Sequence, residues 1–523
     1  MASDGTHSWT AQSDRPNPLN ATRLSSAAAL RVLDQRVFEA ARFILPDPPT
    51  SPSTEVGLDT ATLLGRMLKI ASAGSSRSIP WLILTAVTGR FPSVDDVRAV
   101  QRTIQLEPLD AVETALLGRA VRFASESRID LPMRVVTTPL VDVDTSGRLD
   151  YQSGIHRVVR ETVSRWAGAH EIELGIWDDT YRIFRSAAPR EVARVVRFGA
   201  TVTSDEVDPG YEPELLVPWN TVVVLPDVPI GMPTEALAGI AHCSGNRLSA
   251  VGYDLIPITS VETRPIHDAM AAGEWLVPLK AADRIAGIST SATAEFSGFA
   301  QMLEAQGLTG PLVREVRLPA STAPTWLGVR NRARRDKPRI VFSGTREPHK
   351  NHRALLFAAE RLWTEGLSFE VRMVGGNGWT DEHVRETIER LTADGRSLVD
   401  LGRVSEEVLW SELADADAVA FVSLHEGYGL PLVEALAVGT PVLTTSYGSQ
   451  AEIAADGGCI TVDPRDDLSI VQGLRQLVTD ADFRDALVRE ARDRPDTTWD
   501  YYAAELWDFL VAPLLEEASH ETS

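Results

Sequence analysis

Cysteine is scarce in this sequence of 523 residues, where Cys243 and Cys459 are the only two and lie far apart in the chain. Two cysteines at such a separation exclude a disulfide-stapled fold and give no spacing typical of a metal site or a redox pair. We expect both to be buried thiols in a reducing cytoplasm.

Positive charge is also in short supply. The chain has 51 Lys and Arg against 73 Asp and Glu, which gives a net charge of -22 and an isoelectric point near 4.9. Nucleic-acid binding requires clustered basic side chains that neutralise phosphates. The charge balance therefore argues against a nucleic-acid partner, although an acidic chain can still contain a basic pocket.

Long apolar runs and targeting signals are missing as well. The most apolar stretch, IPWLILTAV, has about half of the roughly 18 residues that a membrane-spanning helix needs. The N-terminal residues, MASDGTHSWTAQSDRPNPLNATR, lack the pattern of a signal peptide and predict a disordered lead-in over 1–23. We therefore expect a cytoplasmic protein, or one peripheral to the inner face of the membrane.

The chain has two successive regions with different hydrophobic patterns. From 24 to 130, apolar residues recur at helical spacing between Pro- and Ser-rich breaks. In 131–320, short β-branched runs alternate with amphipathic stretches, and a Pro- and Arg-rich linker at 321–338 leads to a second such series at 339–512, with 513–523 as a tail. This alternation is typical of parallel sheets covered by helices. We predict an α/β fold of two doubly wound, Rossmann-like domains that face a cleft, preceded by a helical region.

The stretch HEGYGLPLVEALAVG follows the strand-like AVAFVSL and carries two acids in otherwise apolar surroundings. Gly427 and Gly429 let the backbone approach a ligand closely, and the helix that follows offers unpaired N–H groups to an anion. Glu426 and Glu434 are then both expected to face the cleft. Two exposed helix-cap acids are the plain alternative, which the spacing alone does not exclude.

The sequence here resembles the retaining glycosyltransferases of family 4, whose two-domain fold is called GT-B and whose signature is two glutamates separated by seven residues. The resemblance covers about residues 133–512, and its motifs occur in the family's order: YQSGIHRVVRET, YDLIPI, ADRIAGISTSATAEF, IVFSGTREPHKNHRALLFAAERL, MVGG, LGRVSEEVLWSELADADAVAFVS and ALAVGTPVLTTSYGSQAEI. In its motifs the chain is similar to bacterial surface-polysaccharide mannosyltransferases. The helical region lies outside the resemblance.

The resemblance implies transfer of a sugar, with retention at the anomeric carbon, from a nucleotide-diphosphate donor to a glycan or lipid-linked acceptor. GDP-mannose is the leading expectation for the donor, and UDP- and dTDP-linked sugars remain open. No metal or other cofactor is expected. The helical region is a candidate contact with a membrane surface or with other proteins of a complex.

The family assigns roles to three charged residues. Its second glutamate holds the ribose hydroxyls and its first orients the hydroxyls of the sugar, and these roles pass to Glu434 and Glu426. An ionised carboxylate accepts two hydrogen bonds at once, which suits vicinal diols. The lysine that binds the diphosphate corresponds to Lys350, where fixed positive charge meets the charge that develops on the leaving group.

This chain departs from the family pattern at two positions. Many relatives carry an arginine directly after the glycine that ends a strand, where this chain has Thr345, so Arg346 is the remaining candidate for a second catalytic cation. Many relatives also have a histidine at the position of Tyr253, whose phenol cannot supply an imidazolium charge. The neighbouring Asp254 is left as either a polar contact or a turn cap.

The other donor contacts that the resemblance implies are mostly backbone groups at loop and helix starts. They are Gly344, Thr345, Arg403, Val404, Gly154, Ile155, Gly427, Tyr428, Gly429 and Leu430. His156 and Arg157 are further candidates, with Arg157 equally explained as a structural residue.

Two other classes of protein remain open. A non-hydrolysing nucleotide-sugar epimerase shares the GT-B fold, but it lacks the glutamate spacing and acts without an acceptor. A catalytically silent relative would bind a sugar nucleotide or act as a scaffold. Release of nucleoside diphosphate, with and without acceptor, separates the three classes.

Overall fold

The computed structural model describes residues 26–50, 58–126, 131–149, 153–178, 182–197, 210–228, 234–320, 324–327, 335–379, 382–495 and 497–521. The predicted lead-in lies outside these residues, as do 321–323 and 328–334 of the predicted linker. The chain divides into two compact units, one of residues 1–135 with 213–217 and the other of residues 136–212 with 218–523. We call the first the helical unit and the second the sheet unit.

The described part of the helical unit forms α1 (Ser26–Ile44), α2 (Leu58–Ala73), α3 (Ser78–Thr88), α4 (Val94–Leu106), α5 (Leu109–Glu126), β1 (Met133–Val136) and β5 (Leu215–Pro218). The apolar stretch noted above is α3, an interior helix in which every residue from Pro80 to Thr88 is buried. Gln35 of α1 holds β1, because its side-chain amide donates to the Met133 carbonyl and accepts from the Met133 N–H, both at 2.8 Å. None of the helices in the described ranges is long and apolar enough to cross a membrane.

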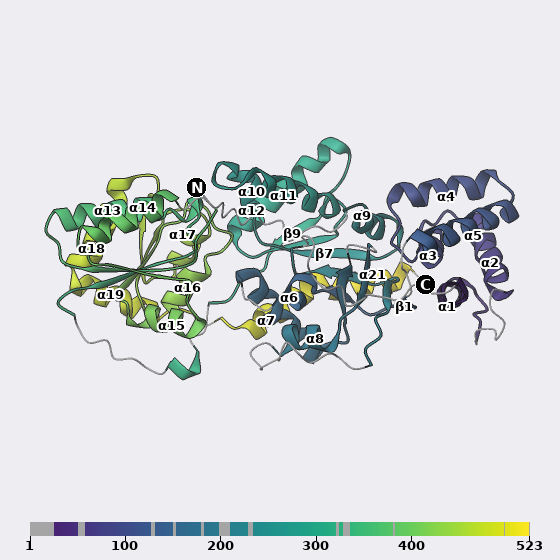
Figure 1. The fold of residues 1–523 in the computed structure, drawn as a ribbon, viewed down its shortest axis with the longest axis horizontal. Helices are drawn as coiled ribbons and strands as arrows, with labels where there is room; N and C mark the ends of the chain where they lie inside the picture. Colours follow the sequence, from purple (N-terminus) through teal and green to yellow (C-terminus); the bar gives the residue numbers. More distant parts are fainter. Residues whose placement is uncertain are drawn as a thin grey trace, which may run out of the picture. The chain divides into compact units, whose positions relative to one another are not determined.

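The sheet unit begins with a sheet whose strands in this unit run in the order β4-β3-β2-β6-β7-β8-β9. Figure 1 shows helices on both sides of its strands β7 and β9. All its pairs are parallel except the β3–β4 pair, which is antiparallel. The elements of this first-sheet half are β2 (Leu140–Asp142), α6 (Asp144–Arg148), α7 (Gly154–Ala169), β3 (Glu173–Asp178), β4 (Ile183–Ser186), α8 (Pro189–Val196), β6 (Val222–Leu225), α9 (Thr234–Cys243), β7 (Arg247–Gly252), α10 (Ile256–Thr259), η1 (Val261–Thr263), α11 (Ile266–Leu279), β8 (Arg284–Gly287), α12 (Thr290–Met302), η2 (Leu303–Gln306) and β9 (Leu312–Glu315). Central strands such as β6, VVVL, are buried throughout, as expected when helices cover both faces of a parallel sheet.

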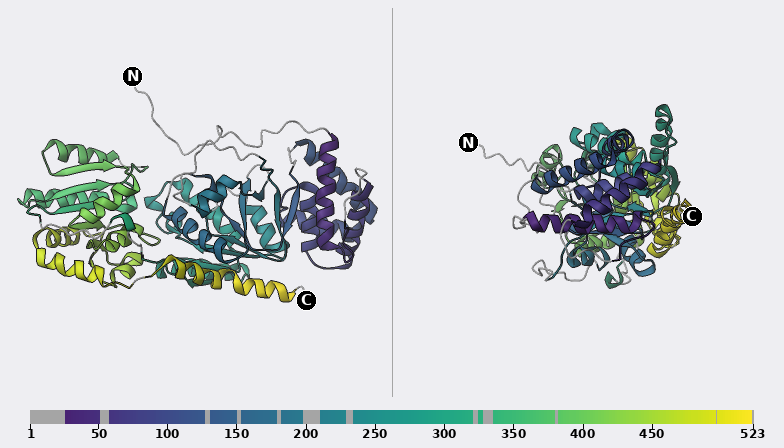
Figure 2. Two further views of the ribbon diagram at one scale, coloured as in Figure 1. Left: turned by 90° about the horizontal axis from the view of Figure 1, so that it is seen from below. Right: turned by 90° about the vertical axis from the view of Figure 1, so that its right-hand side faces the viewer.

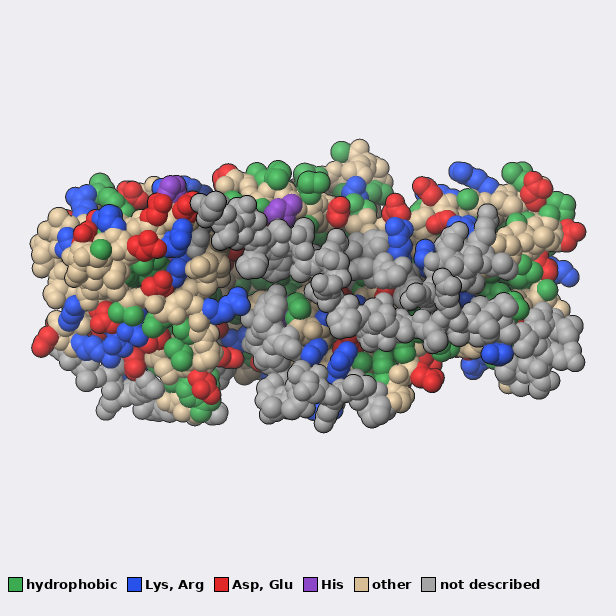
Figure 3. Space-filling view, viewed as in Figure 1, with side chains coloured by type: hydrophobic (Ala, Val, Ile, Leu, Met, Phe, Trp, Pro, Cys, Tyr) green, Lys and Arg blue, Asp and Glu red, His purple; other side chains and the backbone are tan. Residues whose placement is uncertain are grey.

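A short helix, η3 (Thr325–Leu327), precedes a second sheet of six parallel strands in the order β12-β11-β10-β13-β14-β15. The second-sheet half contains β10 (Arg339–Ser343), η4 (Pro348–Lys350), α13 (His352–Thr364), β11 (Glu370–Val374), α14 (Glu382–Ala393), β12 (Leu398–Gly402), α15 (Glu406–Asp415), β13 (Ala418–Phe421), α16 (Leu430–Ala437), β14 (Val442–Thr445), α17 (Gly448–Ala454), β15 (Cys459–Val462), α18 (Asp467–Thr479) and α19 (Ala481–Arg492). Over α13 and α14, acidic and basic side chains are interspersed on the face in Figure 3, and Arg390 pairs with Glu360 at 2.6 Å between these helices.

The last two helices, α20 (Trp499–Leu510) and α21 (Ala512–Glu521), return to the first-sheet half, where Figure 2 shows them in yellow. The indole N–H of Trp166 on α7 donates to the carbonyl of Ala503 at 2.8 Å, and Arg284 donates to the carbonyl of Phe509 at 3.0 Å. The sequence-based division placed α20 with the second domain and called 513–523 a tail. The structure forms helices there because α20 buries Tyr502, Leu506 and Leu510 against the first-sheet half.

The predicted fold class is confirmed, with two doubly wound sheets in an α/β arrangement and helices ahead of them in the chain. The antiparallel strand β4 was not predicted. The compact units also differ from the predicted boundary at 130, because β1 and β5 group with the helical unit.

Candidate active site

A cavity of about 640 Å³ lies within the sheet unit, where loops at the carboxyl ends of its strands meet the start of α7. Ligands of doubly wound folds bind at this edge of the sheet. The cavity is lined by most of the predicted site residues, namely Glu426, Lys350, Glu434, Gly427, Tyr428, Gly429, Leu430, Gly344, Thr345, Arg403, Val404, Gly154, Ile155 and the further candidate Arg157, whereas Arg346 and the further candidate His156 do not line it. Residues far apart in the sequence therefore converge on one space.

Lys350 and Glu426 form a close ion pair in the wall of this cavity. The Lys350 Nζ lies 2.6 Å from Oε1 and 2.9 Å from Oε2 of Glu426, and both side chains are mostly buried. Lys350 ends the short helix η4, and Asn351 follows it in the left-handed conformation, with φ of 59°. This turn directs the lysine toward the loop that carries Glu426, and the pair places the Lys350 ammonium beside the Glu426 carboxylate in the cavity wall.

Glu434 lies on α16 and is paired with an arginine from the other half of the unit. Its Oε1 is 2.8 Å from Nη1 of Arg157 on α7, and the two side chains are only 12% and 13% exposed. Burial raises the pKa of Glu434 to about 7, with a further increase from Glu406, while Arg157 opposes the change. The carboxyl therefore titrates near neutral pH.

The loop between β13 and α16 owes its course to two glycines. Gly429 has φ of 114°, a conformation that other residues rarely adopt, and it precedes the first turn of α16. A Cβ at Gly427 would lie 2.6 Å from the carbonyl oxygen of Tyr253, so no larger residue fits between the two halves there. The close backbone approach that was predicted at Gly427 therefore brings this loop against Tyr253 of the first-sheet half.

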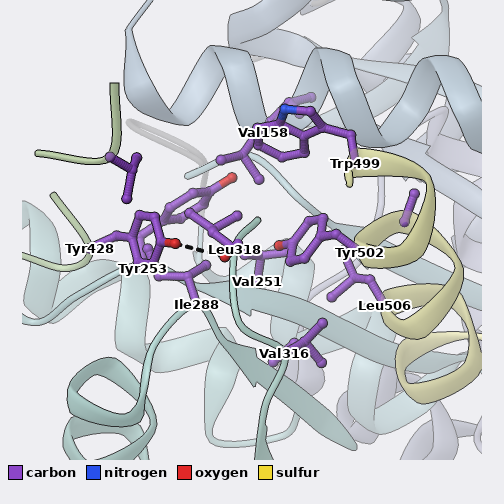
Figure 4. Close-up of a cluster of buried hydrophobic side chains, with 14 of the residues drawn as sticks. Val158, Val251, Tyr253, Ile288, Val316, Leu318, Tyr428, Trp499, Tyr502 and Leu506 are labelled. Carbon is purple, nitrogen blue, oxygen red and sulfur yellow. Dashed lines mark hydrogen bonds between the residues drawn. The ribbon is translucent and has the colours of Figure 1, made fainter. Parts of the chain in front are cut away.

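Tyr253 and Asp254 form the opposite wall. The Tyr253 hydroxyl donates to the Pro226 carbonyl at 2.7 Å, so this phenol serves packing. Figure 4 shows Tyr253 and Tyr428 in one cluster of buried side chains, where Tyr428 donates to the Leu318 carbonyl at 2.7 Å. Burial raises the pKa of Asp254 to about 6, and its Oδ1 accepts from the Ile256 N–H at 3.1 Å.

Arg346, predicted as a second catalytic cation, is not among the residues that line the cavity. Its side chain is 5% exposed, pairs with Asp400 and donates to Asn377 Oδ1 at 2.9 Å. Its backbone N–H also donates to the Gly376 carbonyl at 3.0 Å. These contacts join the loop after β10 to the loop after β11, so we assign Arg346 a positioning role in place of the predicted contact with the donor.

Several lining residues were not on the predicted list. They are Ser153, Val158, Tyr253, Asp254, Ile288, Leu318, Ser343, Val374, Gly375, Gly376, Ser405, Glu406, Leu409 and Pro431. Glu406 opens α15 and is indistinguishable in sequence from an ordinary acid in a first helical turn. The motif MVGG was the one available signal for Gly375 and Gly376. Within the described ranges, no group of three or more His, Cys, Asp and Glu side chains is arranged to hold a metal ion.

The chemistry of the wall suits a ligand with hydroxyls at two places and negative charge between them. Glu426 and Glu434 are acceptors for hydroxyls. Lys350, Arg157 and Arg403 are cations of the wall, and the starts of α7 and α16 supply backbone N–H groups through Gly154 and Leu430.

Comparison with known proteins finds a family match confined to the second-sheet half and its flanks. Residues 329–494 match the family described as glycosyl transferases group 1. The O-antigen chain mannosyltransferase B of Escherichia coli is 32% identical over 162 residues, which cover 31% of this chain and 42% of that protein. The serotype-specific mannosyltransferase WbdA of Escherichia coli is 34% identical over 119 residues, or 23% of this chain and 15% of that protein.

The chain thus spans less than half the length of these curated relatives. Among solved structures, a sucrose-phosphate synthase from Thermosynechococcus elongatus superposes with a TM-score of 0.48 at 14% identity, covering 74% of this chain and 100% of that one. The resemblance predicted from the motifs is confirmed for residues 329–494, which match the group 1 glycosyl transferases and are related to polysaccharide mannosyltransferases.

Proposed function

We propose, from the match of residues 329–494 to the group 1 glycosyl transferases, that this protein transfers a sugar from a nucleotide-diphosphate donor to a glycan or lipid-linked acceptor. We expect mannose from GDP-mannose, transferred with retention at the anomeric carbon, in the synthesis of a surface polysaccharide. The mannosyltransferase names of two relatives support this choice of sugar.

One observation carries the proposal: Glu426, Lys350 and Glu434 line a single cavity. Lys350 lies far from the two glutamates in the sequence, and the fold brings the three side chains together. The Lys350 ammonium opposes the negative charge that grows on the leaving diphosphate, which is the electrostatic stabilisation that such a reaction needs. Glu434 accepts from the ribose hydroxyls, and Glu426 accepts from the hydroxyls of the sugar. Lys350 holds the Glu426 carboxylate in place for this task by donating to both of its oxygens.

A guanine base is supported by Glu406, which lines the cavity and lies near enough to Glu434 to raise its pKa. Guanine presents N1–H and N2 amine donors side by side, and a carboxylate accepts such a pair with two oxygens. Glu407 is exposed and does not line the cavity, so it offers a matched control. Glu406→Gln should weaken GDP binding more than UDP binding, and Glu407→Gln should change neither.

The experiment measures release of nucleoside diphosphate from GDP-mannose, UDP-glucose and dTDP-rhamnose, each with and without an oligosaccharide acceptor. GDP-mannose with a mannose-terminated acceptor should give the fastest release. A thermal-shift screen with GDP, UDP and dTDP provides the binding readout, because a ligand at a hundred times its dissociation constant stabilises a protein by about 2.7 kcal/mol.

Glu426→Gln keeps the size of the side chain and removes its charge. GDP should still bind, while transfer falls about 10²-fold or more. Binding of a sugar nucleotide without any release would identify a silent binding protein, and conversion of the sugar without acceptor would identify an epimerase. Either result overturns the proposed transfer.

A further inference from the structure

Successive residues of the loop that carries Glu426 form hydrogen bonds with different halves of the sheet unit. The Glu426 carbonyl accepts from Ser449 Oγ at 2.9 Å within the second-sheet half. The Gly427 carbonyl accepts from Ser289 Oγ at 2.7 Å in the first-sheet half. His425, directly before Glu426, also reaches into the first-sheet half.

Both ring nitrogens of His425 are engaged there. Its Nδ1 lies 2.8 Å from Ser260 Oγ, and its Nε2 lies 3.0 Å from Glu295 Oε1 on α12. Glu295 is itself fixed, because it accepts from the Leu255 N–H at 2.7 Å and from Thr259 Oγ1 at 3.0 Å. The imidazole therefore meets a preorganised acceptor, and a movement of the Glu426 loop away from α12 breaks these contacts.

We propose that His425 is a positioning residue for Glu426, which it fixes across the cavity by bridging Glu295 and Ser260. The inference rests on the proposed sugar transfer, because it is Glu426 that the bridge orients. Catalysis depends on such orientation, since a displacement of about 1 Å in a positioned group costs about 10²-fold in rate. Sugar transfer thus requires the bridge, whereas nucleotide binding through Glu434 does not.

The charge of the bridge follows from its surroundings. Hydrogen bonding to Glu295 raises the pKa of His425, Asp254 and Glu426 add to this effect, and burial opposes it. His349 of η4 lies close enough to His425 for their charges to interact. Burial lowers the pKa of His349 to about 2, so this second imidazole stays neutral. A raised histidine pKa means that the charged bridge is complete below the ordinary value of 6.5 and is lost as the pH rises through the higher value in the folded protein.

The experiment compares the pH dependence of turnover at saturating GDP-mannose in the wild type, His425→Gln and His425→Lys. In the wild type, turnover should fall as the pH rises through the His425 pKa. Glutamine keeps the two hydrogen bonds without charge, so His425→Gln should be about tenfold slower near neutral pH and should lack this alkaline decline. Lysine keeps a charge toward Glu295 and should recover part of the loss, also without the decline.

His383→Gln is the matched control, because His383 is an exposed histidine outside the cavity lining that pairs with its helix neighbour Glu386 at 3.5 Å. It should keep the wild-type rate and profile. GDP affinity should stay within about twofold of the wild type in His425→Gln and His425→Lys. A wild-type alkaline decline in His425→Gln, or equal losses of GDP affinity and turnover, would overturn the positioning role.

A second measurement does not depend on catalysis. Nuclear magnetic resonance titration of the His425 ring should give a pKa above 6.5 in the wild type and a lower one in Glu295→Gln. If the protein turns over no sugar nucleotide but the titration behaves in this way, the bridge stands and the proposed function fails. If turnover is present but Glu295→Gln leaves the His425 pKa unchanged, the bridge itself is refuted.

Discussion

Nucleotide binding should depend on pH through Glu434, because burial raises the pKa of this carboxyl to about 7. At that pKa, about nine tenths of the carboxyls are ionised at pH 8 and about one tenth at pH 6. In the proposed complex the ribose hydroxyls donate to the ionised form of Glu434, so protons compete with the nucleotide for this carboxylate. The dissociation constant for GDP should therefore rise by up to about tenfold between pH 8 and pH 6 on account of Glu434.

The assay is isothermal titration calorimetry with GDP at intervals from pH 6 to pH 8, on the wild type and on Glu434→Gln. The phosphates of GDP also titrate in this range, but they do so equally with both proteins, so the ratio of the two dissociation constants isolates Glu434. At pH 8 the ratio should be about ten or more, because a charge-assisted hydrogen bond is worth about 1.5–3 kcal/mol. At pH 6 it should be about tenfold smaller, because only about one tenth of the Glu434 carboxyls are then ionised. A ratio that stays constant across this range would refute the reasoning.

Arg157 provides the companion variant, because it is the cation that faces Glu434 from α7 at 2.8 Å, and Glu406 is the acid that faces it from α15. Arg157→Met removes the one influence that lowers the pKa of Glu434. The pH at which GDP binding is half-maximal should therefore move upward. Tighter binding in this variant at pH 8 would mean that Arg157 competes with the ribose for Glu434.

Three further outcomes follow from the contacts described. Lys350→Met should lower turnover about 10²-fold and GDP-mannose affinity far less, and equal losses in both would mean that Lys350 merely docks the donor. Arg346→Met should lower the free energy of unfolding in denaturant titration by about 1–3 kcal/mol through lost hydrogen bonds, whereas a loss of GDP affinity with unchanged stability would contradict its positioning role. Burial raises the pKa of Asp142 well above its ordinary value of 3.8, which costs stability as the pH rises past that value, so Asp142→Asn should raise the melting temperature more at pH 7 than at pH 4.

Much of the fold could be predicted because its signals are local. Strands such as VVVL and AVAF are buried on both faces, and this burial is visible as unbroken apolar runs between helices of regular amphipathic spacing. Strand β4, IFRS, was missed because it is only four residues long, has two apolar residues followed by two polar ones, and pairs antiparallel with β3. The return of α20 to the first-sheet half was missed too, because amphipathic spacing tells which face is buried and not against which sheet.

The candidate site, like the fold, was predicted from the sequence only in part. Glycines and glutamates at fixed spacings already indicated Glu426, Glu434 and the loop between them, because that backbone conformation is required by the residues themselves. Arg346 was predicted as a second catalytic cation, but its side chain does not line the cavity and turns toward Asp400 and Asn377 instead. No pattern in the sequence indicates that Asp400 pairs with Arg346.

The sequence by itself determined the two doubly wound sheets, the helix-start loops and the acids that face them, since each depends on neighbours a few residues away. Only the tertiary structure decided the pairings across the cavity: Arg157 with Glu434, His425 with Glu295, and Gly427 against Tyr253. These partners lie far apart in the chain and come from different halves of the unit. Their burial and mutual charge set the pKa values of Glu434 and His425, which depend on what surrounds a side chain in space and not on its neighbours in sequence.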